Sequence, residues 1–167
     1  MALFLIANGP MPTTAAQVPV TTGTAIKTLL QVKPFNIAKI VEWGISFDGS
    51  AAATPIKVEL LETDVAATVT ASVDADVTKL GPGVVDQAVA SVAGLTLGTA
   101  ATGYTGSAEG TITAVRMLDV QFIAPTNQYV KQFPLGREPV IQIAKFGRIR
   151  VTAGAAVNAY CYMILDI

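Results

Sequence analysis

The residues of this chain that could do chemistry are few, and histidine is not among them. Without histidine the sequence lacks the usual general base, the commonest metal ligand and every Ser–His or Cys–His nucleophile. The single cysteine, Cys161, lies in a strongly apolar segment, so we expect a buried small side chain rather than a nucleophile. These residue types predict that the chain is not an enzyme and has no catalytic residues.

Three carboxylates, Glu59, Glu62 and Asp64, lie close enough in sequence to suggest the carboxylate pair of a glycosidase. In a strand, however, Glu59 and Glu62 point to opposite faces. We therefore expect solvated charges at the edge of a sheet.

Two further motifs fail on inspection. Asp74 and Asp76 have the spacing of the first calcium-loop ligands, but Lys79 stands where the glycine is required and no glutamate closes the loop. The glycines of GYTGSAEG (103–110) lack the Lys-Ser/Thr pair of a phosphate-binding loop. The sequence predicts no metal and no cofactor.

The residues that could contact a partner are of two kinds. Arg148 and Arg150 share one face of an expected strand, where they could clamp a phosphate or carboxylate or, as we favour, pair with acids across the sheet. Tyr104 lies in a glycine-rich segment and is the aromatic residue we most expect to touch a partner. Trp43 is expected to anchor the core.

The composition favours association. Of 167 residues, 51% are apolar and only 14% charged, with a net charge of −1, so much of the surface must be Ala, Thr, Gly and Ser. Such a surface has little self-repulsion, which predicts a protein that assembles with copies of itself or with other proteins. A pI of about 5.3 argues against nucleic acid as the main partner.

Charge is unevenly distributed along the chain. Residues 64–110 carry five acids against one lysine, a net −4, and residues 111–150 carry six basic residues against two acids, a net +4. These segments could meet between neighbouring copies, or could simply be solvated faces.

The first twenty residues predict an extended arm. The apolar run ALFLIA (2–7) is too short to span a bilayer and meets Asn8-Gly9-Pro10 at once, so we expect no membrane segment, no signal peptide and a soluble, non-secreted chain. The prolines that follow prevent a long regular element. The arm could fold back as an edge strand or reach a neighbour, and its residues Leu3, Phe4 and Leu5 are contact candidates.

Alternating hydrophobicity then predicts strands. Residues 36–48 place Ile37, Val41, Trp43, Ile45 and Phe47 on one face, with Lys39 as the exception, and end at an Asp-Gly turn. The second strand covers residues 56–62.

The segment 64–110 is rich in Ala, Thr, Val and Gly and is expected to be a long insertion, with a short helix at 84–94. Strands resume after Thr111. In the last strand both faces are apolar, so a second layer or a neighbouring subunit is expected to cover its outer side.

Eight or nine short strands without a repeat predict an all-β domain over residues 21–167, a two-sheet β-sandwich of jelly-roll type. An immunoglobulin-like sandwich is the alternative.

Two segments, VEWGISFDGSAAATPIKVELLET and QFPLGREPVIQIAKFGRIRVTAGAAVNAYCYMIL, resemble small β-rich virion proteins of tailed bacteriophages. The resemblance implies a capsid decoration or cement protein on the surface of the phage head, made in the cytoplasm of the bacterial host. It implies a homotrimer whose partner is the major capsid protein or another virion protein. No catalytic residues are implied, and the low-charge segment 64–110 departs from the pattern.

Two other functions fit the same features. A tail or baseplate component would form rings or tubes. A carbohydrate-binding sandwich needs an exposed aromatic platform, for which one Trp and four Tyr offer little material.

Overall fold

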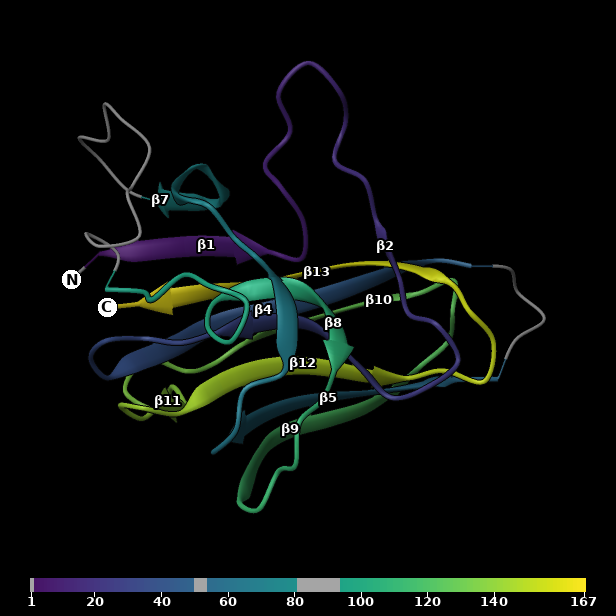
Figure 1. Ribbon diagram of the computed structural model, residues 1–167. Helices are drawn as coiled ribbons and strands as arrows, with labels where there is room; N and C mark the ends of the chain where they lie inside the picture. The colour runs from purple at the N-terminus through teal and green to yellow at the C-terminus, as the bar shows by residue number, and fades with distance from the viewer. Residues whose placement is uncertain (1, 50–53, 81–93) are drawn as a thin grey trace.

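The computed structural model describes residues 2–49, 54–80 and 94–167, which fold into two antiparallel β-sheets packed face to face as a β-sandwich (Figure 1). The strands are β1 (Leu3–Ala7), β2 (Val20–Thr21), β3 (Lys27–Val32), β4 (Ala38–Asp48), β5 (Ile56–Thr63), β6 (Thr68–Ala71), β7 (Val77–Leu80), β8 (Gly103–Ala108), β9 (Val115–Ile123), β10 (Gln128–Gln132), β11 (Val140–Ile141), β12 (Phe146–Thr152) and β13 (Asn158–Asp166), with a 3₁₀ turn η1 (Asp74–Asp76) before β7. The predicted all-β class is confirmed.

One sheet has the strand order β10-β4-β13-β1-β7, with β11 and β2 added at the ends of β4 and β13. The other has the order β6-β8-β3-β12-β5-β9. We call them the seven-stranded and the six-stranded sheet. The core between them is built from aliphatic side chains around Trp43, which is fully buried as predicted.

The inner face of β13 follows the predicted alternation, with Ala159, Cys161, Met163 and Leu165 buried. Its opposite side carries half-buried apolar side chains on the outer face of the seven-stranded sheet. The N- and C-terminal ends of the chain lie at one end of the sandwich because β1 and β13 pair antiparallel (Figure 1).

The predicted inward face of β4 is wrong in its first half. Ile40 is buried and Ile37 exposed, whereas Trp43, Ile45 and Phe47 are buried as expected. The register against β13 shifts between Ile40 and Glu42, so a β-bulge there reverses the phase of the alternation. Lys39 consequently lies on the outward side, and its apolar-side placement was wrong.

The expected N-terminal arm is partly an interior strand. β1 lies between β13 and β7 in the seven-stranded sheet, and Phe4 and Ile6 are buried in the core. The loop after β1 rises above the sheet before the chain returns at β2 (Figure 1).

The segment 64–110 is also more integrated than a long insertion. Its strand β7 extends the seven-stranded sheet beside β1, and its strands β6 and β8 extend the six-stranded sheet beside β3. The helix expected at 84–94 falls on residues that, apart from Gly94, lie outside the described ones.

Candidate interface along strand β9

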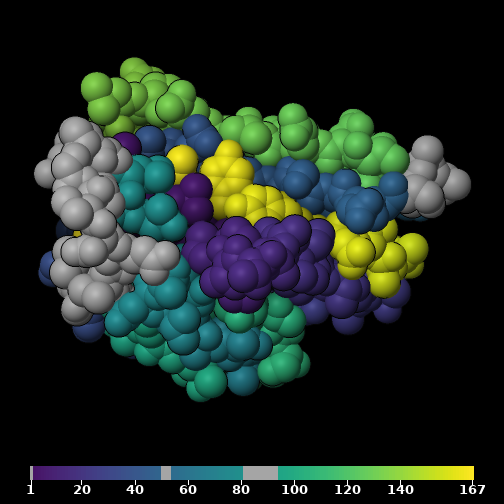
Figure 2. All heavy atoms as spheres, turned by 90° about the horizontal axis from the view of Figure 1, so that it is seen from above, coloured from purple at the N-terminus to yellow at the C-terminus, as the bar shows by residue number. Residues whose placement is uncertain are grey.

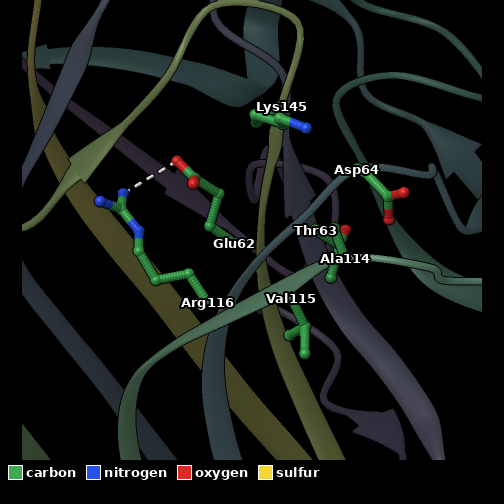
Figure 3. Close-up of a pocket in the computed structure, with 7 residues that line it drawn as sticks. All are labelled: Glu62, Thr63, Asp64, Ala114, Val115, Arg116 and Lys145. Atoms are coloured by element: carbon green, nitrogen blue, oxygen red, sulfur yellow. Dashed lines mark hydrogen bonds and ion pairs between the residues drawn. The ribbon is translucent and has the colours of Figure 1, made fainter.

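The three carboxylates that suggested a glycosidase each have partners of their own, which are cations for Glu59 and Glu62 and the Thr113 hydroxyl for Asp64. Glu59 binds Lys57 and Arg150 at 2.7 and 2.9 Å, whereas Glu62 binds Arg116 at 3.0 Å. Glu62 and Asp64 both line a hollow of about 180 Å³ at the end of β5, but their carboxyl groups point apart (Figure 3).

The pKa values of Asp64 and Glu59 are shifted in the direction opposite to the one that a general acid needs. Hydrogen bonds from Thr113 and the backbone lower the pKa of Asp64 to about 2. The pKa of Glu59 is also lowered, because its bonds to Lys57 and Arg150 outweigh the effect of burial. A glycosidase acid requires a raised pKa, so this arrangement supports ion pairing instead.

The failed calcium loop has a structural role. Asp76 accepts hydrogen bonds from the backbone N–H groups of Val73 and Met11 at 2.8 and 3.1 Å, which fixes η1 and the N-terminal loop. Within the described residues no three His, Cys, Asp or Glu side chains gather as metal ligands would.

Cys161 is fully buried, as expected, and burial raises the pKa of its thiol well above the ordinary value. The neighbouring Asn8 makes two hydrogen bonds to the backbone of β13. Its side-chain amide N–H donates to the carbonyl of Ala159, and its side-chain carbonyl accepts from the N–H of Cys161. This strand centre is therefore packed and hydrogen-bonded within the chain.

The two arginines pair with acids, as favoured. Arg150 lies directly opposite Glu59 in the β12–β5 register and binds it. Arg148 is 0% exposed and binds Glu109 at 3.3 Å as well as the Val65 carbonyl. Arg148 therefore fastens segment 64–110 onto the six-stranded sheet. Because its side chain is buried, the suggestion that Arg148 contacts a partner is corrected.

The other contact candidates divide by face. Phe4, at 2% exposure, is enclosed by the core, which corrects its proposed role. Leu3 and Leu5 are half-buried on the outer face of the seven-stranded sheet. Tyr104 is half-buried on β8 opposite Leu30 and Thr70, and burial raises its pKa.

The strongest candidate site is strand β9, which was not among the contact candidates predicted from the sequence. Among the described strands β9 pairs with β5 alone, so it forms one edge of the six-stranded sheet. Its register shifts between Met117 and Asp119, leaving Leu118 as the extra residue of a β-bulge.

Because of the bulge, the apolar and the polar side chains of β9 lie on opposite faces of the sheet. Residues directly opposite each other share a sheet face, and the β5 partners of Val115, Met117, Val120 and Phe122 all lie on the outer face. Val115 and Met117 are 59% exposed and Phe122 is 72% exposed. We call these four side chains the β9 stripe.

The polar residues of β9 point the other way, toward the seven-stranded sheet. Asp119 accepts a hydrogen bond from Tyr129 at 3.1 Å and pairs with Lys131 at 3.1 Å, both on β10 of the opposite sheet. Arg116 binds Glu62 (Figure 3). It also donates to the carbonyl of Val140 on β11. Polar groups thus tie the two sheets together, while apolar groups face outward.

This inverted strand was detectable in principle. Without Leu118 the residues of β9 from Val115 to Phe122 alternate between apolar and polar. The pattern alone does not say which face is inside, so the direction of the stripe needed the structure.

No helix of the described residues has the length and apolar character required to cross a membrane.

The sequence matches no protein-family model, and searches of curated proteins and of solved structures also find no significant match. The resemblance to phage virion proteins therefore stays a prediction.

Proposed function

We propose that this chain is a structural protein that works by assembling with copies of itself and with other virion proteins. The observation that carries the proposal is the β9 stripe. A long edge strand that exposes the apolar side chains of Val115, Met117 and Phe122 is a surface that proteins normally cover by association.

The strand order supports a jelly-roll topology. When the two-residue strands β2 and β11 and the strands β6, β7 and β8 of segment 64–110 are set aside, eight strands remain. The first of these, β1, pairs with the last, β13, and the next pairs inward are β3·β12, β4·β10 and β5·β9. A hairpin folded over in this way is the pattern of double-sheet jelly rolls, which occur in viral capsid and lectin domains. Fold analogy alone does not set function.

The composition supports the same role. Net charge −1 gives little repulsion between copies, and the charges of β9 are used within the chain on Glu62 and Lys131. We propose a homotrimer on a phage head, contacting the major capsid protein, with a tail or baseplate component as the alternative.

The first test is the mass of the purified protein by light scattering across concentration. We expect an oligomer, with a trimer as the specific expectation. Phe122→Ser and Met117→Ser should weaken association by about tenfold or more each if these residues are interface hot spots. Val18→Ser, at a loop position 69% exposed, is the matched control and should leave the mass unchanged.

Electron microscopy of the oligomer, alone and mixed with empty heads of the encoding phage, separates the alternatives. A coat on the heads supports decoration, whereas rings or tubes formed by the protein alone support a tail component. A monomer that binds neither, with the stripe variants unchanged, contradicts the proposal.

A further inference from the structure

The outer face of the seven-stranded sheet carries two hollows that share one wall, Tyr160. One, of about 430 Å³, lies between Tyr160, Leu5 and the loop that holds Met11 and Gln17. The other, of about 260 Å³, lies between Tyr160, Tyr162 and strand β10. We call these two neighbouring hollows together the tyrosine groove.

Figure 2 looks down on this face. The yellow C-terminal strand lies between the purple N-terminal segment on one side and the blue and green strands β4 and β10 on the other. The groove is therefore bounded by chain segments from both ends of the sequence.

The loop wall of the groove is fixed before any ligand arrives. Asn8 is fully buried and bonds the backbone of β13 through both its amide and its carbonyl. Three residues on, the backbone N–H of Met11 donates to Asp76 at 3.1 Å, and the Thr78 hydroxyl donates to the Met11 sulfur. A preformed wall lowers the entropy that binding would cost.

The floor presents an aromatic ring laid flat on the sheet. Tyr162 lies directly opposite Gly44, and a Cβ at Gly44 would stand 2.6 Å from Cε1 of Tyr162. Only a glycine leaves room for the ring there. The Tyr162 hydroxyl donates to Glu42 at 2.6 Å, which holds the ring in place, and the Tyr160 ring follows at 6.3 Å with a tilt of 35°.

The chemistry of this lining fits a sugar. The faces of aromatic rings carry partial negative charge and attract the C–H groups of a pyranose ring. Ser46 and Gln128 line the smaller hollow and Gln17 the larger, so hydroxyl and amide groups stand beside the rings where sugar hydroxyls need partners.

The charge of the groove narrows the ligand further. Among the residues that line the two hollows there is no lysine or arginine, and the Tyr162 hydroxyl donates to the Glu42 carboxylate. An anionic sugar would meet no cation here.

We propose that the tyrosine groove binds a neutral oligosaccharide, with Tyr160 and Tyr162 stacking on the sugar rings. This activity is separate from assembly through the β9 stripe, which lies on the other sheet. The protein would then carry a saccharide-binding face as well as an assembly edge.

The test is an NMR titration of the full chain with cellohexaose, maltohexaose and chitohexaose, and with oligogalacturonate as the anionic probe. We expect shifts at the amides of Tyr160, Tyr162 and Gln128 with at least one neutral probe and none with the anionic one. Tyr160→Ala should weaken binding by about tenfold. Tyr104→Phe, on the other sheet, is the control and should bind as the unaltered chain does.

Because Tyr160→Ala could disturb the sheet, Gln128→Ala at the groove wall is the second variant, and each variant's amide spectrum is compared with that of the unaltered chain. Gln128→Ala should keep the fold and weaken binding. No shift with any neutral probe, or shifts with the anionic probe alone, would overturn the proposal. Protection of the same amides in the protein's own oligomer without sugar binding would instead assign the groove to protein contact.

Discussion

Arg148 holds its guanidinium group inside the protein, bonded to Glu109 and to the carbonyl of Val65. Its pKa is lowered mainly by desolvation, which Glu109 partly offsets. We expect Arg148→Met to lower the free energy of unfolding by about 3 kcal/mol, because both partners lose a buried donor. Urea denaturation measures the change.

Arg150→Met is the matched control on the same strand. Arg150 is partly exposed, and its partner Glu59 keeps the ion pair with Lys57, so the loss should be below about 1 kcal/mol. Equal losses at the two positions would show that Arg148 does not fasten segment 64–110 as described.

Asp64 gives the chain a pH-dependent contact near the start of β9. Its folded pKa of about 2 lies below the ordinary 3.8, so the stability it adds is fully present above about pH 4 and is lost as the pH falls towards 2. Thr113→Val removes the hydroxyl that donates to Asp64. We expect the Asp64 midpoint, followed by carboxyl ¹³C NMR, to rise towards 3.8 in this variant.

An unchanged midpoint in Thr113→Val would mean that the backbone N–H groups alone hold the carboxylate.

For single residues, the sequence predicted whether a side chain is buried better than it predicted which residue it contacts. Trp43 and Cys161 could be placed in the core from their apolar neighbours, and both are buried. The partner of Arg148 could not be predicted, because Glu109 lies 39 residues away and no local pattern joins them.

Strand β1 decides what an N-terminal truncation does. Because β1 pairs with β13 and β7 and buries Phe4 and Ile6, deleting residues 2–7 should abolish cooperative unfolding rather than only weaken association. Phe4→Ala alone should cost about 3–5 kcal/mol. Thermal unfolding by circular dichroism measures both.

Leu3→Ala is the control for β1, since Leu3 is only half-buried and should cost clearly less than Phe4→Ala. A truncated chain that still unfolds cooperatively with unchanged stability would restore the extended-arm interpretation.

Elements with regular alternation were predictable, and those with bulges or two buried faces were not. Strand β5 was predicted nearly to its ends, because Ile56, Val58 and Leu60 alternate with polar residues. Strand β3 was missed because five consecutive residues are buried, including Thr28 and Gln31, and its register shifts against β12. Its polar side chains are buried under residues that come later in the chain, such as Ala67 and Glu109.

For the whole molecule, the response of association to salt separates two driving forces. If the β9 stripe drives assembly, raising NaCl from 0.05 to about 1 M should leave the oligomer intact or strengthen it, because apolar contacts are not screened. If the net −4 and +4 segments drove it, salt would dissociate the oligomer. Sedimentation velocity at several salt concentrations measures this.

The structure favours the first outcome, because Glu109 of the acidic segment already pairs with Arg148 of the basic one within the chain.

The fold class was predictable from many short alternating segments. The order in which strands pair was not read from the pattern, since alternation identifies a strand but not its neighbour.

The bulge at Leu118 has a second consequence, for the risk of fibril formation. A regular, flat edge strand can template an endless sheet, whereas a bulge increases the local twist and interrupts the row of backbone donors and acceptors. Leu118, the extra residue in the strand that carries the stripe, therefore discourages growth of the sheet by the addition of further strands. If copies associate through the stripe as proposed, they can cover it with side chains and close into a finite particle, while the bulge obstructs amyloid growth at this edge.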